Sequence, residues 1–360
     1  MKSGWPSSQV HLLIFFPNIA CRPIQKPIKR AGVLGLLLFG LSCFPCLAQN
    51  QHILTSETNS DLVGRNISTN VSREETLIDV AVRYQLGYNM IRSANPGVDN
   101  WLPDNGSRVL LPFNLILPDA PREGIVINTA EMRLFFYRED EQNNNTVTVY
   151  PISVGRRDWA TPLTVTRVTL RIEHPPWYPP KSIRAEHAAR GDFLPRVVPA
   201  GPNNPLGDYL LALAIPSYFI HGTNKRFGIG MQVTHGCIRM YPEHIEELYN
   251  LVSVNTLVTI VNQPYKVGWK DEKLYVEVHH PLELDGVVHE GNRPGVVSKL
   301  TSIQQKLPEV LIDWDRVDNA LSEATGIPVL VGTEPHSLSD FEFYQNHIQS
   351  DHSNWLDMIQ

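Results

Sequence analysis

The stretch Val233-Thr234-His235-Gly236-Cys237-Ile238-Arg239-Met240 lies between predicted strands and a predicted helix, and it governs how the whole chain is interpreted. A cysteine attacks a carbonyl as its thiolate, and a free thiol with a pKa of about 8.5 is mostly protonated at neutral pH. Cys237 therefore needs a base, for which His235 and the upstream His221 are candidates. Gly236 permits a tight turn in which backbone N–H groups point at one oxyanion.

The positions of the cysteines favour a functional thiol at Cys237. The chain has four cysteines, and three lie near the N-terminus: Cys21, Cys43 and Cys46. Residues 1–48 are predicted to be a signal peptide, with a basic region, an apolar stretch and a cleavage site after Ala48. The exported chain would then keep one thiol without a disulfide partner, which favours a function for it. The alternative is a buried, inert cysteine.

Composition and charge limit the classes of function. The formal net charge is −6, and no basic stripe is visible, which argues against nucleic acid as a partner. Hydrophobic residues make up 42% of the chain, as in ordinary globular proteins. Proline is plentiful (28 residues) and clusters in predicted loops at 175–180 and 195–205, a pattern typical of a β-rich protein with stiff connections.

Residues 65–119 are predicted to form a small module after a polar linker over residues 49–64. Helical spacing of apolar residues predicts one helix over 75–84, a second follows at 88–94, and a short strand covers 108–112. This order resembles the βααβ LysM carbohydrate-binding module. The resemblance rests on Glu75-Thr76-Leu77, Ala81, Tyr84, Asn95-Pro96 and Val109-Leu110-Leu111-Pro112. Glu74-Glu75-Thr76 replaces the usual Gly-Asp-Thr, and a helical spacer without a ligand is the alternative.

Strands dominate the prediction from Gly124 onward. Runs rich in β-branched and aromatic residues predict strands at 125–127, 132–137, 146–154, 165–172, 218–220 and 256–261. One helix is predicted in this part, starting at Pro242 after the cysteine stretch. We expect a β-dominated catalytic domain over residues 123–262. The extension over 263–360 is predicted to hold a strand at 273–278, a helix at 315–324 and a polar tail.

The cysteine stretch, preceded by His221-Gly222-Thr223, resembles the signature of the L,D-transpeptidases with a YkuD-type catalytic domain. Further matching pieces follow in the family's order: Val154-Gly155, Thr161-Pro162, Pro176-Trp177-Tyr178-Pro179-Pro180, Asn204-Pro205-Leu206-Gly207 and Tyr265-Lys266-Val267-Gly268-Trp269. Asn255 departs from the glycine that many members carry. The resemblance implies a β-sandwich with a short helix after the catalytic loop. A LysM-like module ahead of it points to the periplasmic ErfK/YbiS group.

This resemblance implies a mechanism without a cofactor. Cys237 would attack the diaminopimelate carbonyl of a peptidoglycan tetrapeptide stem, release D-Ala and pass the acyl group to an amine. The amine would come from a second stem, giving a 3→3 cross-link, or from an outer-membrane lipoprotein. His221 would be the base, oriented by a backbone carbonyl, while His235 and Gly236 shape the oxyanion site. Substrate binding is assigned to Gly222, Thr234 and Arg239, with bracing of the loop as the alternative for Arg239. Carbapenems would acylate the thiol.

Three other functions stay open on the sequence. His221, His235 and Cys237 are three potential zinc ligands, but the companion motifs of zinc deaminases are absent, so we expect no metal. The chain could be a peptidoglycan-binding protein with a decayed catalytic domain, although the intact residues argue against decay. Transfer to water would make it a hydrolytic L,D-carboxypeptidase.

Overall fold

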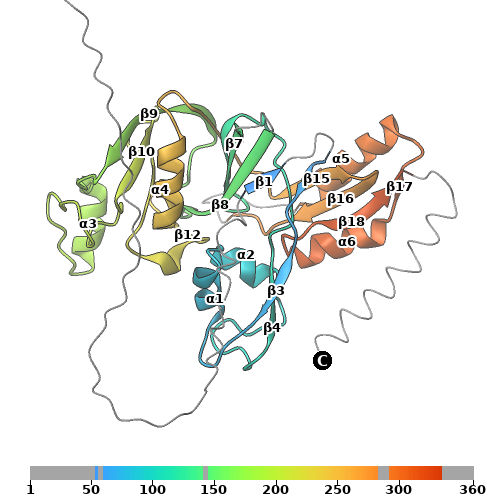
Figure 1. Ribbon diagram of the computed structural model, residues 1–360, viewed down its shortest axis with the longest axis horizontal. Coiled ribbons are helices and arrows are strands. Elements are labelled where there is room, and N and C mark those ends of the chain that lie inside the picture. Colours follow the sequence, from blue (N-terminus) through green and yellow to red (C-terminus); the bar gives the residue numbers. More distant parts are fainter. Residues whose placement is uncertain (1–52, 56–59, 141–144, 283–291, 335–360) are drawn as a thin grey trace, which may run out of the picture. The chain divides into compact units, whose positions relative to one another are not determined.

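The computed structural model describes residues 53–55, 60–140, 145–282 and 292–334 (Figure 1). The predicted signal peptide over 1–48 and the end of the polar tail lie outside these residues. Among the described helices, none combines the length and the apolar composition that crossing a membrane requires.

The predicted catalytic region is one hydrogen-bonded sheet in the order β1-β8-β13-β11-β10-β9-β14-β6-β7, and β7 also pairs with β8, which closes the circuit. The prediction of a mainly β domain is therefore confirmed. Short strand β12 (Gln232–Thr234) pairs with β8 off this path. The other strands are β1 (Ile53–Thr55), β6 (Gly124–Asn128), β7 (Arg133–Glu139), β8 (Asn145–Gly155), β9 (Thr164–Glu173), β10 (Tyr209–Leu213), β11 (Phe219–His221), β13 (Ile238–Met240) and β14 (Leu257–Val261).

The core of this domain lies between the closed sheet and α4 (Pro242–Leu251), which starts with the predicted proline. Ile245 and Leu248 of α4 pack with strand residues such as Leu211, Ile220 and Ile238. The helix follows the cysteine stretch directly, so its burial anchors the C-terminal end of that stretch. Asn255, which replaces the family's glycine, has φ +73°, a left-handed conformation that asparagine tolerates better than most residues.

A second helix in this domain, α3 (Lys181–Ala189), was not predicted. Ile183 is its one buried residue, so it lacks the apolar stripe that reveals an amphipathic helix. Pro180 precedes it and Gly191, at φ +80°, follows it, which are ordinary boundary residues of a helix. The expectation of one helix over 123–262 was therefore wrong, because weak burial hid α3. A short 3₁₀ turn, η1 (Arg226–Gly228), lies before β12.

The segment over 65–119 has the predicted order of strand, two helices and strand. It consists of β3 (Ile67–Asn70), α1 (Leu77–Arg83), α2 (Tyr88–Ser93) and β4 (Arg108–Leu111), with β3 and β4 antiparallel. Thr76 and Asp79 form a capping box at the start of α1. Leu77, Val80 and Ile91 pack with strand residues in a separate small core. We call this segment the N-terminal module; its LysM identity stays a prediction.

Residues 49–64 do not behave as a free linker where the structure describes them. β1 pairs with β8, and β2 (Leu62–Val63) pairs with β5 (Leu115–Ile116). Leu62 and Val63 are both buried. The segment was predicted to be a linker because its composition is polar. Its two strands have only three and two residues, too few to show an alternating apolar pattern in the sequence, and backbone pairing with β8 and β5 holds them.

The N-terminal module contacts the catalytic domain through two glycines. Tyr88 N donates to Ile229 O at 2.9 Å and Asn89 N donates to Gly230 O at 3.2 Å. α2 has no side-chain cap, so these carbonyls satisfy its first N–H groups. A Cβ on Gly230, whose φ is +81°, would lie 2.3 Å from the Cα of Gly87. The backbones can meet here because both residues lack a side chain.

Residues 265–333 form a second sheet, β15-β16-β18-β17, with two helices. The predicted strand at 273–278 and helix at 315–324 correspond to β16 (Lys273–Val278) and α6 (Trp314–Glu323). The sequence did not predict β15 (Tyr265–Lys270), α5 (Arg293–Lys306), β17 (Leu311–Ile312) or β18 (Val329–Thr333). Only Val296 and Leu300 are buried on α5, so its pattern was too weak to stand out. The extension is thus largely folded between 265 and 333, not a polar tail.

Candidate active site

The pairing of two short strands brings the predicted nucleophile and base together. β11 and β13 run parallel, with Ile220 opposite Ile238 and His221 opposite Arg239. Side chains alternate between the faces of a strand, and Ile220 and Ile238 point into the core. His221 and Arg239 therefore share the opposite face. Cys237, one residue before β13, continues this alternation onto the same face as His221.

The Cys237 thiol lies at the edge of the protein interior. It is partly exposed, and its Sγ is 3.6 Å from the carbonyl oxygen of Ser217. Burial raises the pKa of the Cys237 thiol to about 11, while a backbone hydrogen bond from Phe219 and the charge of Arg239 act in the opposite direction. The resting thiol is therefore protonated at neutral pH and must lose its proton during the reaction.

His221 has the arrangement expected of a base. Its Nδ1 is 2.7 Å from the carbonyl oxygen of Gly222, so Nδ1–H donates and Nε2 keeps a free lone pair. The imidazole is only 6% exposed. Burial, followed by the charge of Arg239, lowers the pKa of His221 to about 4, and backbone hydrogen bonds with Gly222 and Leu206 oppose this shift. His221 is thus neutral at pH 7 and able to accept a proton.

The turn that carries Cys237 depends on glycine at position 236. Gly236 has φ +98°, and a Cβ there would lie 2.8 Å from the ring of Tyr218. The turn is closed by two threonine hydroxyls. Thr234 Oγ1 donates to Cys237 O at 2.6 Å, and Thr161 Oγ1 donates to Gly236 O at 2.9 Å. Both of these backbone carbonyls are therefore engaged within the protein.

His235 lies on the same turn but contacts a different set of groups. Its Nε2 is 2.8 Å from Glu186 Oε2 on α3, and Trp159 packs edge-on against its ring. The guanidinium of Arg156 holds both oxygens of Glu186, each at 2.8 Å. The sequence analysis missed Glu186 and Arg156. The boundary residues of α3 could have revealed the helix, but no local pattern links Glu186 to His235, 49 residues away.

The remaining predicted site residues are close to the thiol. Arg239 Nε is buried and has no hydrogen-bond partner among the described residues. A Cβ on Gly222 would lie 3.1 Å from Ile245 Cγ2 and 3.3 Å from the carbonyl of Leu206, so glycine lets these segments approach. An unpaired guanidinium nitrogen fits anion binding better than bracing of the loop, for which a partner would be expected.

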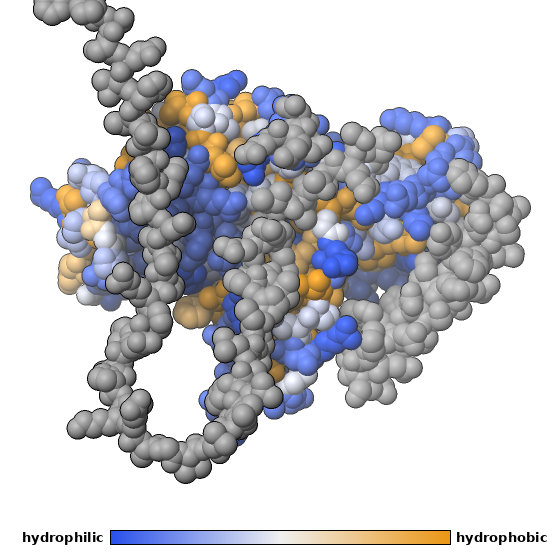
Figure 2. Space-filling model, in the orientation of Figure 1, coloured by the Kyte–Doolittle hydropathy of each residue, from blue (hydrophilic) through white to orange (hydrophobic). Residues whose placement is uncertain are grey.

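A row of apolar residues leads away from the thiol along the sheet. Phe219 of β11 pairs with Ala212 of β10, and Ala212 pairs with Leu170 of β9, so the three share the face of Cys237. Leu170 is 58% exposed although it is hydrophobic. Trp177 packs partly buried beside this row, whereas Tyr178 is exposed. On the face seen in Figure 2, hydrophilic residues predominate around α3 with isolated hydrophobic ones between them.

The structure does not gather His221, His235 and Cys237 into a set of metal ligands. Within the described ranges, one group of His, Cys, Asp or Glu has ligand atoms within 4.8 Å of one another, and it consists of Glu131, Glu277 and His279. Lys266 Nζ already lies 2.8 Å from Glu131 Oε2 and 3.0 Å from Glu277 Oε1. An ammonium group thus takes the place that a cation would need.

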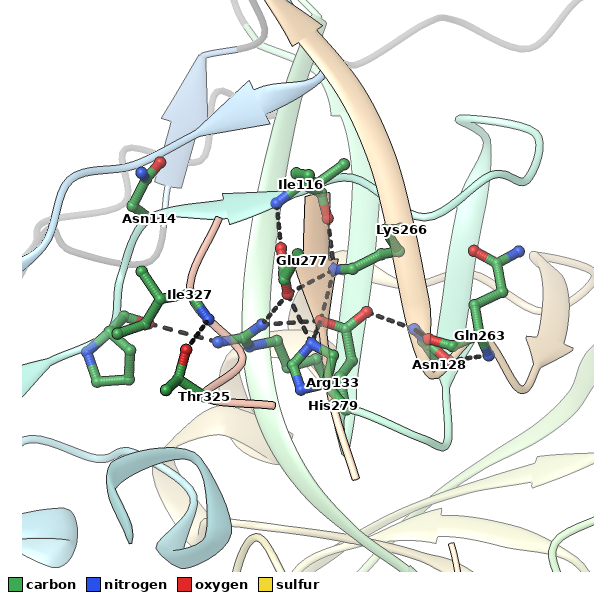
Figure 3. Close-up of polar contacts among 12 residues, drawn as sticks. Asn114, Ile116, Asn128, Arg133, Gln263, Lys266, Glu277, His279, Thr325 and Ile327 are labelled. Carbon is green, nitrogen blue, oxygen red and sulfur yellow. Dashed lines mark hydrogen bonds and ion pairs between the residues drawn. The ribbon is translucent and has the colours of Figure 1, made fainter. Parts of the chain in front are cut away.

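We call Glu131, Arg133, Lys266, Glu277 and His279 the buried charge cluster. Figure 3 shows Arg133, Lys266, Glu277 and His279 converging beneath Ile116, whose N–H donates to Glu277 and whose C=O accepts from Lys266. Burial alone would raise the pKa of Glu277, but Lys266, His279 and Arg133 hold it well below its usual range. Because breaking a buried ion pair costs about 3–5 kcal/mol, the cluster ties the C-terminal sheet to the catalytic domain.

Comparisons with known proteins agree with this geometry. The YkuD family, described as the L,D-transpeptidase catalytic domain, matches residues 122–260. The Escherichia coli (strain K12) protein named "Probable L,D-transpeptidase YbiS" is 40% identical over 274 residues, which cover 75% of this chain and 88% of the relative. "Probable L,D-transpeptidase ErfK/SrfK" of the same strain is 40% identical over 278 residues, covering 76% of this chain and 88% of the relative.

A third relative supports the same assignment. "Probable L,D-transpeptidase YcfS", also from Escherichia coli (strain K12), is 44% identical over 229 residues, covering 62% of this chain and 71% of the relative. The matches extend beyond the catalytic domain that the family model covers. The predicted membership is confirmed: this chain belongs to the L,D-transpeptidase family.

Proposed function

We propose that this enzyme cleaves and rejoins peptidoglycan stem peptides through a thioester on Cys237. The observation that carries the proposal is the parallel pairing of β11 and β13, which sets His221 and Cys237 on one face of the sheet. His221 Nε2 takes the thiol proton as Cys237 attacks the diaminopimelate carbonyl of a tetrapeptide stem. D-Ala leaves with a proton returned by His221, and an amine then attacks the thioester.

The polar groups around the thiol support an acyl transfer. The N–H groups of the turn at Gly236 stabilise the oxyanion that forms on the attacked carbonyl. The unpaired Nε of Arg239 supports recognition of a substrate carboxylate nearby. Thr234 holds the carbonyl of Cys237 and so keeps the turn in shape, while Gly222 supplies the carbonyl that orients His221.

The proposed substrate and location follow from the family. Peptidoglycan lies outside the cytoplasmic membrane, so the proposal places the mature enzyme in the periplasm after removal of residues 1–48. The acceptor is the side-chain amine of a second stem, with an outer-membrane lipoprotein as a further candidate. The N-terminal module, if LysM-like, holds the glycan. Its pocket of about 620 Å³ is lined by Asn66, Asn95, Asp99 and Arg108, polar residues suited to sugar hydroxyls.

The first test removes the nucleophile. Purified wild-type enzyme, Cys237→Ala and Cys237→Ser are incubated with a tetrapeptide-stem muropeptide, and released D-Ala is measured. Both variants are expected to release none, and a carbapenem is expected to add its mass to wild type alone. Release of D-Ala by Cys237→Ala at the wild-type rate would refute the mechanism. Muropeptide mass spectrometry of cells with and without the protein then identifies the acceptor.

A further inference from the structure

Glu186 joins the catalytic turn to a helix that the reaction scheme does not use. Its carboxylate contacts His235 of the turn at 2.8 Å and Arg156 through two hydrogen bonds, both at 2.8 Å. Arg156 also contacts Asp158 on its own loop, and Arg190, which caps the C-terminal end of α3, approaches Glu186 at 3.5 Å. His235, Arg156 and Arg190 thus face one carboxylate, which α3 presents.

The contacts form a closed ring. The backbone N–H of Arg156 donates to the carbonyl of Thr234 at 2.9 Å, next to His235. The guanidinium of Arg156 then holds Glu186, and Glu186 returns to His235. Because every member is fixed by two others, the imidazole has little freedom to rotate. Trp159, whose N–H donates to Arg156 O at 2.9 Å, packs against the ring of His235 and limits it further.

The charge on Glu186 determines which nitrogen of His235 carries a proton. The bonds from Arg156, followed by that from His235, lower the pKa of Glu186 to about 2, so the carboxylate is ionised at neutral pH. An ionised carboxylate only accepts hydrogen bonds. His235 Nε2 must therefore be the donor, which fixes one tautomer of the imidazole when it is neutral.

We infer that Glu186 is a positioning residue of this enzyme. It holds His235 in a single tautomer and orientation, and it thereby keeps the N–H groups at Gly236 and Cys237 aimed at the oxyanion. The inference rests on the proposed role of Cys237 in acyl transfer. It also assigns a role to α3, which presents the carboxylate, and to Arg156, which keeps that carboxylate charged and oriented.

The test compares Glu186→Ala, Glu186→Gln and a matched control, Asp192→Asn. Asp192 also pairs with a histidine, His187 of α3, at 2.7 Å, and no contact of Asp192 with the catalytic turn is seen among the described residues. Glu186→Ala is expected to lower kcat for D-Ala release by roughly 10- to 100-fold, typical of losing a group that orients a functional histidine. Glu186→Gln keeps one acceptor oxygen, so its kcat should lie between those of wild type and Glu186→Ala. The kcat of Asp192→Asn should match that of wild type.

A spectroscopic measurement separates orientation from general damage. With ¹⁵N-labelled histidine, the ring nitrogens of His235 should show one tautomer protonated at Nε2 in wild type and a mixture in Glu186→Ala, with assignment from His235→Gln. The result needs no muropeptide, so it stands even if D-Ala release fails in wild type. The inference is overturned if Glu186→Ala keeps wild-type kcat and a single tautomer. It is also overturned if Asp192→Asn loses as much activity as Glu186→Ala.

Discussion

The two histidines near Cys237, His221 and His235, differ in their burial and in their hydrogen-bond partners. His221 is enclosed by the sheet, and its partner is the neutral carbonyl of Gly222. His235 lies on the turn with about a quarter of its side chain exposed, and its partner is the charged Glu186. Burial keeps His221 neutral while the carbonyl of Gly222 engages its Nδ1, whereas a carboxylate partner holds His235 through its Nε2.

On the proposed mechanism, burial rather than proximity in sequence separates the base, His221, from His235. The histidine nearest the cysteine in sequence, His235, has its Nε2 engaged by Glu186. The histidine sixteen residues away shares the face of the thiol because β11 and β13 are paired. The following three predictions test that division of roles, in order of decreasing effect.

Replacing the two histidines should affect the thiol in different ways. His221→Ala removes the base and should slow acylation by about 10²–10⁴-fold. His235→Ala should slow acylation through misplaced oxyanion donors while leaving deprotonation of the thiol intact. The measurement is the pH dependence of Cys237 alkylation by iodoacetamide in each variant. If His235→Ala abolishes reactivity at low pH and His221→Ala preserves it, the two roles must be exchanged.

Acid should destabilise the fold through His221. The folded state lowers the pKa of His221 from 6.5 to about 4, so its contribution to stability is complete above pH 6.5 and is lost as the pH falls through 4. Wild type should therefore lose on the order of 3 kcal/mol of unfolding free energy between pH 7 and pH 4 from this residue alone. The measurement is the unfolding free energy of wild type and His221→Gln, obtained from urea unfolding at several pH values. If this free energy falls equally steeply with decreasing pH in both proteins, the assigned effect of burial on His221 is contradicted.

A high salt concentration should weaken the ion pairs that hold His235 and leave the hydrogen bond of the buried His221 unchanged. The side chains of Arg156, Glu186 and His235 are each about a quarter exposed, so mobile ions can screen them. Raising NaCl from about 0.1 M to 1 M, which shortens the Debye length from about 10 Å to 3 Å, should reduce wild-type activity a few-fold. Glu186→Ala should show no such reduction. A salt effect of equal size in both proteins would argue against a role for the ion pairs.

The sequence sufficed for the family and for most strands of the catalytic domain, while the roles of Cys237 and His221 stay predictions. The cysteine stretch and the run that begins at His221 identify the family by their residues alone, and β-branched residues predict β6, β8 and β14. Pro242 likewise marked the start of α4. These features depend on neighbours within about ten residues, where a sequence pattern carries its information.

Features that depend on distant partners could not be predicted. Glu186 is an ordinary surface residue by sequence, and only the fold brings α3 and its carboxylate to His235, which the cysteine stretch had marked. The buried charge cluster joins Glu131 to Glu277 across 146 positions, and charged residues normally indicate exposure. Lys266 and Glu277 sit on β15 and β16 facing Ile116, where their pairing compensates for the lost water.

The meeting of Gly87 and Gly230 limits how this enzyme can be recombined with others. A hybrid that grafts a foreign N-terminal module onto this catalytic domain would need glycine, or an equally close-fitting backbone, at the grafted position. A hybrid that joins this N-terminal module to a foreign catalytic domain would need glycine at the position of Gly230, since a Cβ there overlaps the backbone of Gly87 and Tyr88. The module and the catalytic domain would therefore have to be exchanged together to keep this contact.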